Sequence, residues 1–210
     1  ETRRRVLASA RAAGFRPRMT ARQMTIAVVI DRHRFTSFGG YIPTLLSCLV
    51  EVLTMHAVAV EHVTEHNPDR LDSRLIDGAL AMAWDDSTID RLRRMPEVPV
   101  VGLNRVDVPE FSAVATDHQR HGEMAVEYLA SRGHRQIAMI CEERNNWGTQ
   151  QRIEGFTSRL AEHGIGMDDC PVAFTDHQPM YGLLRRLTSV CNPTAIFVAN
   201  EDLGLEASHI

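Results

Sequence analysis

The chain has 210 residues, of which 44% are hydrophobic and 24% are charged, and these values are ordinary for a soluble globular protein. A chain of this length buries either one large core or two smaller ones. No apolar run approaches the roughly 18 residues of a membrane-spanning helix, which excludes a spanning segment within this sequence.

The charge is unevenly distributed. Residues 1–24 contain seven Arg and one Glu, a net charge of +6, which leaves −10 for the remainder of a chain whose total is −4. A basic arm on an acidic body is typical of a nucleic-acid contact joined to a separate sensing domain, although a solvated basic helix gives the same charge pattern. The four cysteines are scattered without a CxxC pair, which indicates buried thiols in a reducing cytoplasm.

The first elements are predicted as follows. A helix is expected from Thr2 to Ala13, because apolar residues recur there at helical spacing and Gly14 is a favourable stop. The apolar run Thr25–Ile30 predicts a parallel strand covered on both faces, and helical spacing predicts a helix over Tyr41–Met55. Further strands are predicted at His56–Val60, Gly78–Ala83, Val98–Gly102 and Ser112–Ala115, with helices at Ser87–Arg94 and His118–Ser131.

After Gly133 the alternation starts again. The strands predicted there are Gln136–Cys141, Val172–Phe174 and Ala195–Ala199, and the helices are Gln150–His163 and Met180–Ser189. Alternating strands and helices form a doubly wound, mostly parallel sheet. The sequence therefore predicts an α/β protein of two such subdomains, at residues 25–132 and 133–210. Their ligand is expected in a cleft beyond the carboxyl ends of the strands.

A series of short motifs runs along the chain. The most specific is Val114-Ala-Thr-Asp117, followed by Gly122, Tyr128-Leu129 and Gly133-His-Arg-Gln-Ile-Ala138. The others are Glu1–Pro17, Ala21–Met24, Ile76–Gly78, Val98–Arg105, Arg152–Phe156 and Thr194–Asn200. In this order the motifs resemble the lactose/galactose repressor (LacI/GalR) family of transcriptional regulators.

This resemblance implies a type I periplasmic-binding-protein-like fold with an interlobe cleft. It also implies a cytoplasmic, homodimeric repressor whose affinity for operator DNA is controlled allosterically by a small polar effector, a sugar or sugar derivative. Residues 1–24 then correspond to the remnant of a helix-turn-helix headpiece and its hinge. The first two headpiece helices are missing, and the sequence ends just inside a predicted helix, so we expect the C-terminal subdomain to be incomplete.

Three polar residues match the family's ligand-contacting positions, namely Asp117, Arg152 and Asn200. A guanidinium fork, a carboxylate and an amide suit the hydroxyl groups of a polyol. Two alternatives stay open: Arg152 pairs with a nearby Glu on a helix surface, or Asp117 caps the helix that follows it. Tyr41 follows a loop that lines the cleft in the family, although Gly39 and Gly40 depart from the usual Asn-Pro there.

Two further residues are candidates for stacking on a sugar face, His177 by its family position and Trp84 just after a predicted strand. For Trp84 a partly buried core position is the alternative. At the hinge, Ala21, Arg22 and Met24 are the predicted DNA contacts. Arg22 is suited to phosphates, and Met24 to insertion between base steps in the minor groove, unless this stretch is a tether in the absence of DNA.

Other protein classes fit less well. Asp85-Asp86 could be read as catalytic carboxylates, but adjacent acids at a helix start more often cap it. The pairs His118/His121 and His62/His66 have no third metal ligand placed by the sequence. We therefore expect that the chain is not an enzyme and has no cofactor or metal site. A periplasmic solute-binding protein for a sugar shares the fold and remains the alternative, and the basic residues 1–24 favour the regulator.

Overall fold

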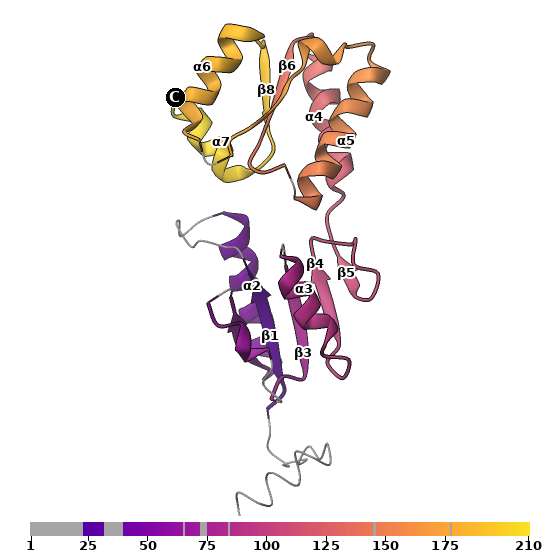
Figure 1. The fold of residues 1–210 in the computed structure, drawn as a ribbon, viewed down its shortest axis with the longest axis vertical. Coiled ribbons are helices and arrows are strands. Elements are labelled where there is room, and N and C mark those ends of the chain that lie inside the picture. The colour runs from indigo at the N-terminus through magenta and orange to yellow at the C-terminus, as the bar shows by residue number, and fades with distance from the viewer. Residues whose placement is uncertain are drawn as a thin grey trace, which may run out of the picture.

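The structure is a computed structural model that describes residues 23–31, 40–64, 66–71, 75–83, 85–144, 146–176 and 178–210. The described residues form two α/β lobes, one above the other in Figure 1. Each lobe has a parallel sheet of its own, as the alternation of strands and helices predicts. No helix in the described ranges is long and apolar enough to cross a membrane.

The first lobe has a five-stranded sheet in the order β2-β1-β3-β4-β5. Its strands are β1 (Thr25–Ile30), β2 (Ala59–Val63), β3 (Gly78–Met82), β4 (Val100–Leu103) and β5 (Ser112–Val114). All four strand pairs are parallel. The helices of this lobe are α2 (Tyr41–Met55), the 3-10 turn η1 (Pro68–Arg70) and α3 (Asp86–Arg93).

Strand β1 contributes to a core on each side of this sheet, because successive residues of a strand point to opposite faces. Ala27 and Val29 pack in the cluster that holds Leu92 of α3. Val28 and Ile30 pack against the apolar stripe of α2, which consists of Ile42, Leu45, Leu46, Leu49 and Leu53. Burial on both faces explains why this strand is an uninterrupted apolar run in the sequence.

The second lobe has a three-stranded parallel sheet in the order β7-β6-β8. Its strands are β6 (Ile137–Cys141), β7 (Val172–Phe174) and β8 (Ala195–Val198). Its helices are α4 (His118–Ser131), α5 (Trp147–Glu162), α6 (Met180–Val190) and α7 (Glu201–Ser208), with a 3-10 turn η2 (Met167–Asp169).

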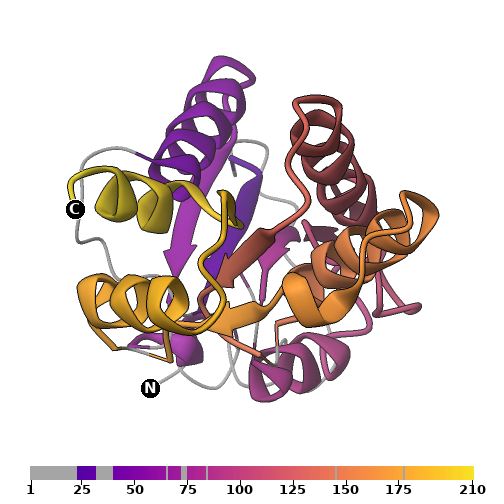
Figure 2. The same cartoon turned by 90° about the horizontal axis from the view of Figure 1, so that it is seen from above.

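Strand β6 is covered on both sides in the same way. Met139 packs with Phe156 of α5 and Val126 of α4, whereas Ile140 packs with Leu183 of α6. Figure 2 looks down on this lobe and shows α4 and α5 on one side of β6, with α6 and α7 on the other.

Helix α4 belongs to the second lobe, because Val126 and Ala130 pack in the same core as Phe156. The chain therefore passes between the lobes at residues 115–117, and the predicted boundary at 132/133 is corrected to this position. Gly133 has φ +89°, and its N–H donates to Ala130 O at 3.0 Å. It is a local helix stop, which the sequence pattern does not distinguish from a change of lobe.

Element ends differ from the prediction in two informative places. The strand after α2 begins at Ala59 instead of His56, because the helix is followed by a turn in which Ala57 has φ +55°. Helix α5 begins at Trp147 instead of Gln150, because the Asn146 side chain accepts a hydrogen bond from Thr149 N at 3.0 Å and caps it. The predicted helix Thr2–Ala13 lies outside the described residues.

Candidate functional site

The carboxyl ends of the two sheets face one another. On one side, α4 starts directly after the interlobe segment, and the His118 ring at its first residue lies 5.5 Å from the Trp147 ring at the start of α5. On the other side, a Cβ placed on Gly40 would lie 3.4 Å from Asp202 Oδ1 of α7. We call the residues that follow these strand ends, among them Gly40, His118, Trp147 and Asp202, the interlobe face. Ligands of doubly wound sheets bind beyond such carboxyl ends, at the switch points between strands.

Arg152 lies on α5 near this face and is half-buried. Burial lowers the pKa of its guanidinium. Unlike Arg105 and Arg159, which contact carboxylates, Arg152 has no carboxylate partner among the described residues. Its described neighbour Cys141 is uncharged at neutral pH, because burial raises the pKa of that thiol to about 12. The alternative that Arg152 pairs with a nearby Glu on a helix surface is therefore wrong for the described part of the chain.

Asp117 is the N-cap of α4. Its side chain accepts a hydrogen bond from Arg120 N at 2.8 Å, so the capping interpretation is confirmed. The residue is exposed at the interlobe segment, and a carboxylate has further acceptor capacity beyond this one bond. A second role as a ligand contact remains a prediction.

Asn200 follows β8 and caps α7 by accepting from Leu203 N at 3.3 Å. Its Nδ2 donates to Glu142 Oε2 at 3.1 Å, and Glu142 follows β6. The amide thus joins the ends of two neighbouring strands at the switch point of the second sheet. This is the position that the sequence predicts for a ligand contact.

The remaining predicted residues are only partly within the described ranges. Tyr41 is the first residue of α2, is 48% exposed and lies next to Gly40 at the interlobe face. Trp84, His177, Ala21 and Arg22 lie outside the described residues. Met24 is 56% exposed and precedes β1, so it lies at the amino end of the first sheet, opposite the ligand candidates.

Two residues of the interlobe face were not identified from the sequence. His118, which is 4% exposed, and the half-buried Trp147 pack ring against ring beside the charge of Arg152. The sequence offers His118 only as one of a pair with His121 at a spacing that a metal could use. Among the described residues no group of three or more His, Cys, Asp or Glu side chains is arranged to hold a metal. The sequence has no local signal for this role of His118, because the position of the interlobe segment itself depends on which core accepts α4.

Helices α4 and α5 cross at an unusually short separation. A Cβ on Gly122 would lie 2.1 Å from Arg152 O, and one on Gly155 would lie 1.9 Å from Gln119 O. Neither position accommodates a side chain without separating the helices. The crossing therefore fixes the position of Arg152 relative to the start of α4.

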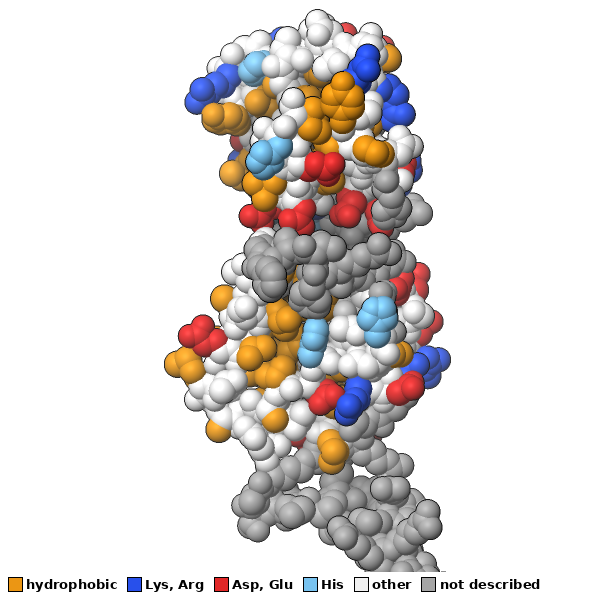
Figure 3. Space-filling model, turned by 90° about the vertical axis from the view of Figure 1, so that its left-hand side faces the viewer, with side chains coloured by type: hydrophobic (Ala, Val, Ile, Leu, Met, Phe, Trp, Pro, Cys, Tyr) orange, Lys and Arg blue, Asp and Glu red, His pale blue; other side chains and the backbone are white. Residues whose placement is uncertain are grey.

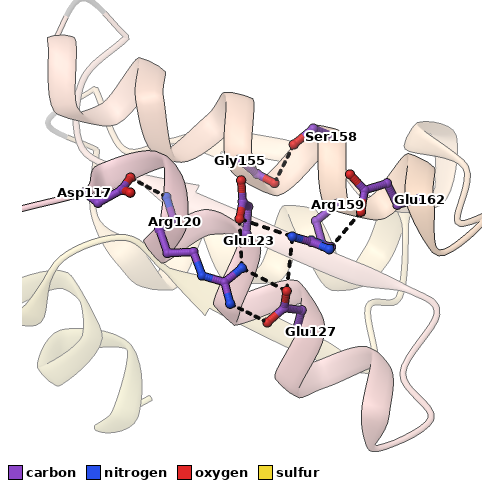
Figure 4. A network of polar contacts seen from close by, with 8 residues as sticks. All are labelled: Asp117, Arg120, Glu123, Glu127, Gly155, Ser158, Arg159 and Glu162. Carbon is purple, nitrogen blue, oxygen red and sulfur yellow. Dashed lines mark hydrogen bonds and ion pairs between the residues drawn. The ribbon is translucent and has the colours of Figure 1, made fainter.

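A network of charges fastens the same two helices (Figure 4). Glu123 Oε2 accepts from Arg120 Nη1 at 2.8 Å on its own helix and from Arg159 Nη2 of α5 at 3.2 Å. Glu127 contacts the same two arginines at 2.9 and 3.2 Å. A carboxylate shared by two guanidinium groups ties α4 to α5 along the exposed side of their crossing.

Acidic side chains gather along the lower margin of the second lobe, where it faces the first (Figure 3). The acids that follow strands β6, β7 and β8 include Glu142, Glu143, Asp176, Glu201 and Asp202. Glu142 is held by Asn200, and Asp176 lies 3.9 Å from Arg144 Nε. This margin offers carboxylate acceptors, which suit ligands with hydroxyl donors.

A pocket of about 400 Å³ opens between β7 and α6, and Asp176 is among its lining residues. Its lining includes Arg144, Phe174, Arg186 and Val190, and Arg144 stacks over the Phe174 ring at 4.1 Å. None of the predicted ligand residues in the described ranges lines it.

Two parallel-sheet lobes with facing carboxyl ends define the class of two-lobe ligand-binding domains. A family model described as periplasmic binding proteins and the sugar binding domain of the LacI family matches residues 49–208. The chain belongs to this family. The structure resembles the crystal structure of a LacI-family transcriptional regulator from Burkhoderia phymatum, with a TM-score of 0.73 and 26% identity over 88% of this chain and 72% of that one.

Curated relatives agree with this assignment. The chain is 30% identical to the probable HTH-type transcriptional repressor ExuR of Bacillus subtilis, over 67% of this chain and 44% of that protein. It is 28% identical to the HTH-type transcriptional regulator RafR of Escherichia coli, over 97% of this chain and 65% of that protein. The chain thus spans about half to two thirds of the length of these relatives.

Proposed function

We propose that this chain is the effector-binding region of a transcriptional repressor, in which a sugar or sugar derivative binds between the lobes and changes the affinity for operator DNA. The names of the relatives support a regulator over a periplasmic solute-binding protein, which has the same fold, and none of the relatives cited above is named as an enzyme. The proposal includes a location in the cytoplasm, where operator DNA is found.

The environment of Arg152 is the observation that supports the proposed binding site. A half-buried guanidinium without a described carboxylate partner has lost hydration without gaining an ion pair. A ligand that presents paired oxygens would supply the missing acceptors, because the guanidinium fork binds such groups through two parallel hydrogen bonds. Asp117 and Asn200 would contribute from the neighbouring helix starts.

A thermal-shift screen tests this site, with hexoses, pentoses, disaccharides, sugar acids and nucleobases as named probes. A ligand at a hundredfold excess over its Kd stabilises by about 2.7 kcal/mol, which corresponds to a rise in Tm of about 5–10 °C for a domain of this size. We expect Arg152→Ala to abolish the rise, and the exposed Arg132→Ala on the same lobe to retain it. Full binding by Arg152→Ala would remove the assignment.

DNA binding is tested with the full-length gene product and its own upstream DNA in a mobility-shift assay. We expect a specific complex whose affinity changes when the ligand from the screen is added. Arg22→Ala should weaken binding to all sequences, because phosphate contacts carry no sequence information. Failure to bind any DNA would favour the solute-binding alternative.

The proposed homodimer has a candidate surface on α2. None of the 15 residues of this helix is fully buried, and Val52 and Met55 are 53% and 77% exposed on it. Apolar side chains of this kind are suited to pairing with a second copy. Sedimentation analysis should give a dimer mass that Val52→Arg reduces to that of a monomer, and an unchanged mass would place the interface elsewhere.

A further inference from the structure

We propose that His118 is a positioning residue that joins the end of β4 in the first lobe to the start of α5 in the second, and so fixes Arg152 relative to both lobes. This inference extends the proposed function, because Arg152 is the residue assigned there to the effector. Its test does not need the effector, so the two proposals can fail separately.

The location of His118 makes this role possible. It is the first residue of α4 and follows the interlobe segment 115–117 directly. Residues 112–117 are exposed, whereas His118 is only 4% exposed, so its side chain turns into the protein where the chain changes lobe. A side chain at this point contacts both lobes without spanning a gap.

On the side of the second lobe, the imidazole packs against the first turn of α5. The rings of His118 and Trp147 are 5.5 Å apart at 73°, an edge-to-face arrangement. A Cβ on Gly148 would lie 3.1 Å from the imidazole, so the ring is seated directly on the helix backbone. Arg152 follows on the same helix, close enough for its charge to affect the imidazole.

On the side of the first lobe, the partner is Asn104, which follows β4 and has φ +62°. Its Oδ1 accepts from Thr116 N at 3.3 Å and from Thr116 Oγ1 at 3.1 Å. Thr116 Oγ1 in turn lies 3.4 Å from His118 Nδ1. These contacts form a continuous polar chain from β4 through the interlobe segment to His118.

The electrostatics fit a neutral imidazole. Burial is the largest cause that lowers the pKa of His118, followed by the positive charge of Arg152, and His121 lowers it further. Hydrogen bonding to the backbone of Asn104 and the carboxylate of Asp117 act in the opposite direction. Protonation would place a second cation beside Arg152 and would disturb the contacts on which its position depends.

Trp147 provides the measurement. The chain has two tryptophans, so Trp84→Phe leaves Trp147 as the only indole. An imidazolium quenches indole fluorescence more strongly than a neutral imidazole. We expect emission to fall with decreasing pH, with a midpoint below the ordinary histidine pKa of 6.5. His118→Gln should remove this transition, and the exposed His163→Gln, at the other end of α5, should leave it unchanged.

Arg152→Gln tests the electrostatic coupling between Arg152 and His118 without altering the histidine itself. Removal of its charge should move the midpoint upward, because one cause of the lowered pKa is lost. Small-angle scattering should also show a larger radius of gyration for His118→Gln than for His163→Gln, because the link between the lobes is weakened. An unchanged midpoint in Arg152→Gln, a transition that survives His118→Gln, or equal radii for the two histidine variants would each overturn the proposal.

Discussion

The crossing of α4 and α5 makes Gly155→Ala a severe test of the packing described above. The added Cβ would lie 1.9 Å from Gln119 O and 2.8 Å from Gln119 C, and both atoms belong to a helix backbone that cannot rotate away. Contact at van der Waals distance requires the helices to separate by more than about 1 Å, and such overpacking typically costs about 1–3 kcal/mol or more. The gain in helix propensity from Gly to Ala offsets about 1 kcal/mol of this.

We therefore expect Gly155→Ala to lower the free energy of unfolding by about 2 kcal/mol and the Tm by about 4–8 °C, as measured by urea and thermal unfolding. Gly182→Ala on α6 is the matched control, since apart from its chain neighbours and its own helix backbone no described atom lies within 4 Å of a Cβ placed there. The control should be neutral or more stable by up to about 1 kcal/mol. Equal stability of the two variants would refute the close crossing.

Three further predictions concern the second lobe and the thiols. Phe156→Ala should cost about 3–5 kcal/mol in urea unfolding, because this fully buried ring fills the core between α5 and β6. The prediction of buried thiols is wrong for Cys48, which is exposed and should react quickly with a thiol reagent in the native protein. Burial raises the pKa of Cys141 to about 12 and should keep this thiol unreactive until unfolding, and retention of the fastest phase in Cys48→Ser would contradict this. Hydrogen bonds from Arg120 lower the pKa of Glu123, so the folded protein binds fewer protons than the unfolded chain near and below pH 4.5. The free energy of unfolding should therefore decrease as the pH falls through this range. Arg120→Gln should reduce the slope of the free energy of unfolding against pH, and an identical slope would argue against the network.

The sequence predicts the architecture well because hydrophobic periodicity is a local property. Thr25–Ile30, Tyr41–Met55 and Val172–Phe174 have the predicted bounds, since each apolar pattern matches the face that is buried. The predicted boundary between the lobes is wrong because its true position depends on which core accepts Val126 and Ala130. That choice is made by tertiary packing and leaves no local signal.

The sequence predicts a residue of the candidate site only where the type and position of that one residue indicate its role. Arg152 and Asn200 lie near strand ends, as expected, but the absence of a described carboxylate partner for Arg152 is a property of the folded chain. His118 and Trp147 are 29 positions apart in the sequence and meet only because α4 and β6 run back along one another. A contact between such distant residues has no periodicity that a sequence pattern could display.

Because α7 approaches the start of α2, ionic strength should affect how the two lobes are held together. The amino end of α2 carries partial positive charge and has no acidic residue in its own first turn, while Asp202 and Glu201 lie beside Gly40 on the opposite lobe. Salt screens an attraction of this kind, whereas it leaves the burial of apolar side chains within each lobe almost untouched. Concentrated electrolyte should thus loosen the arrangement of the two halves at conditions where each half remains folded.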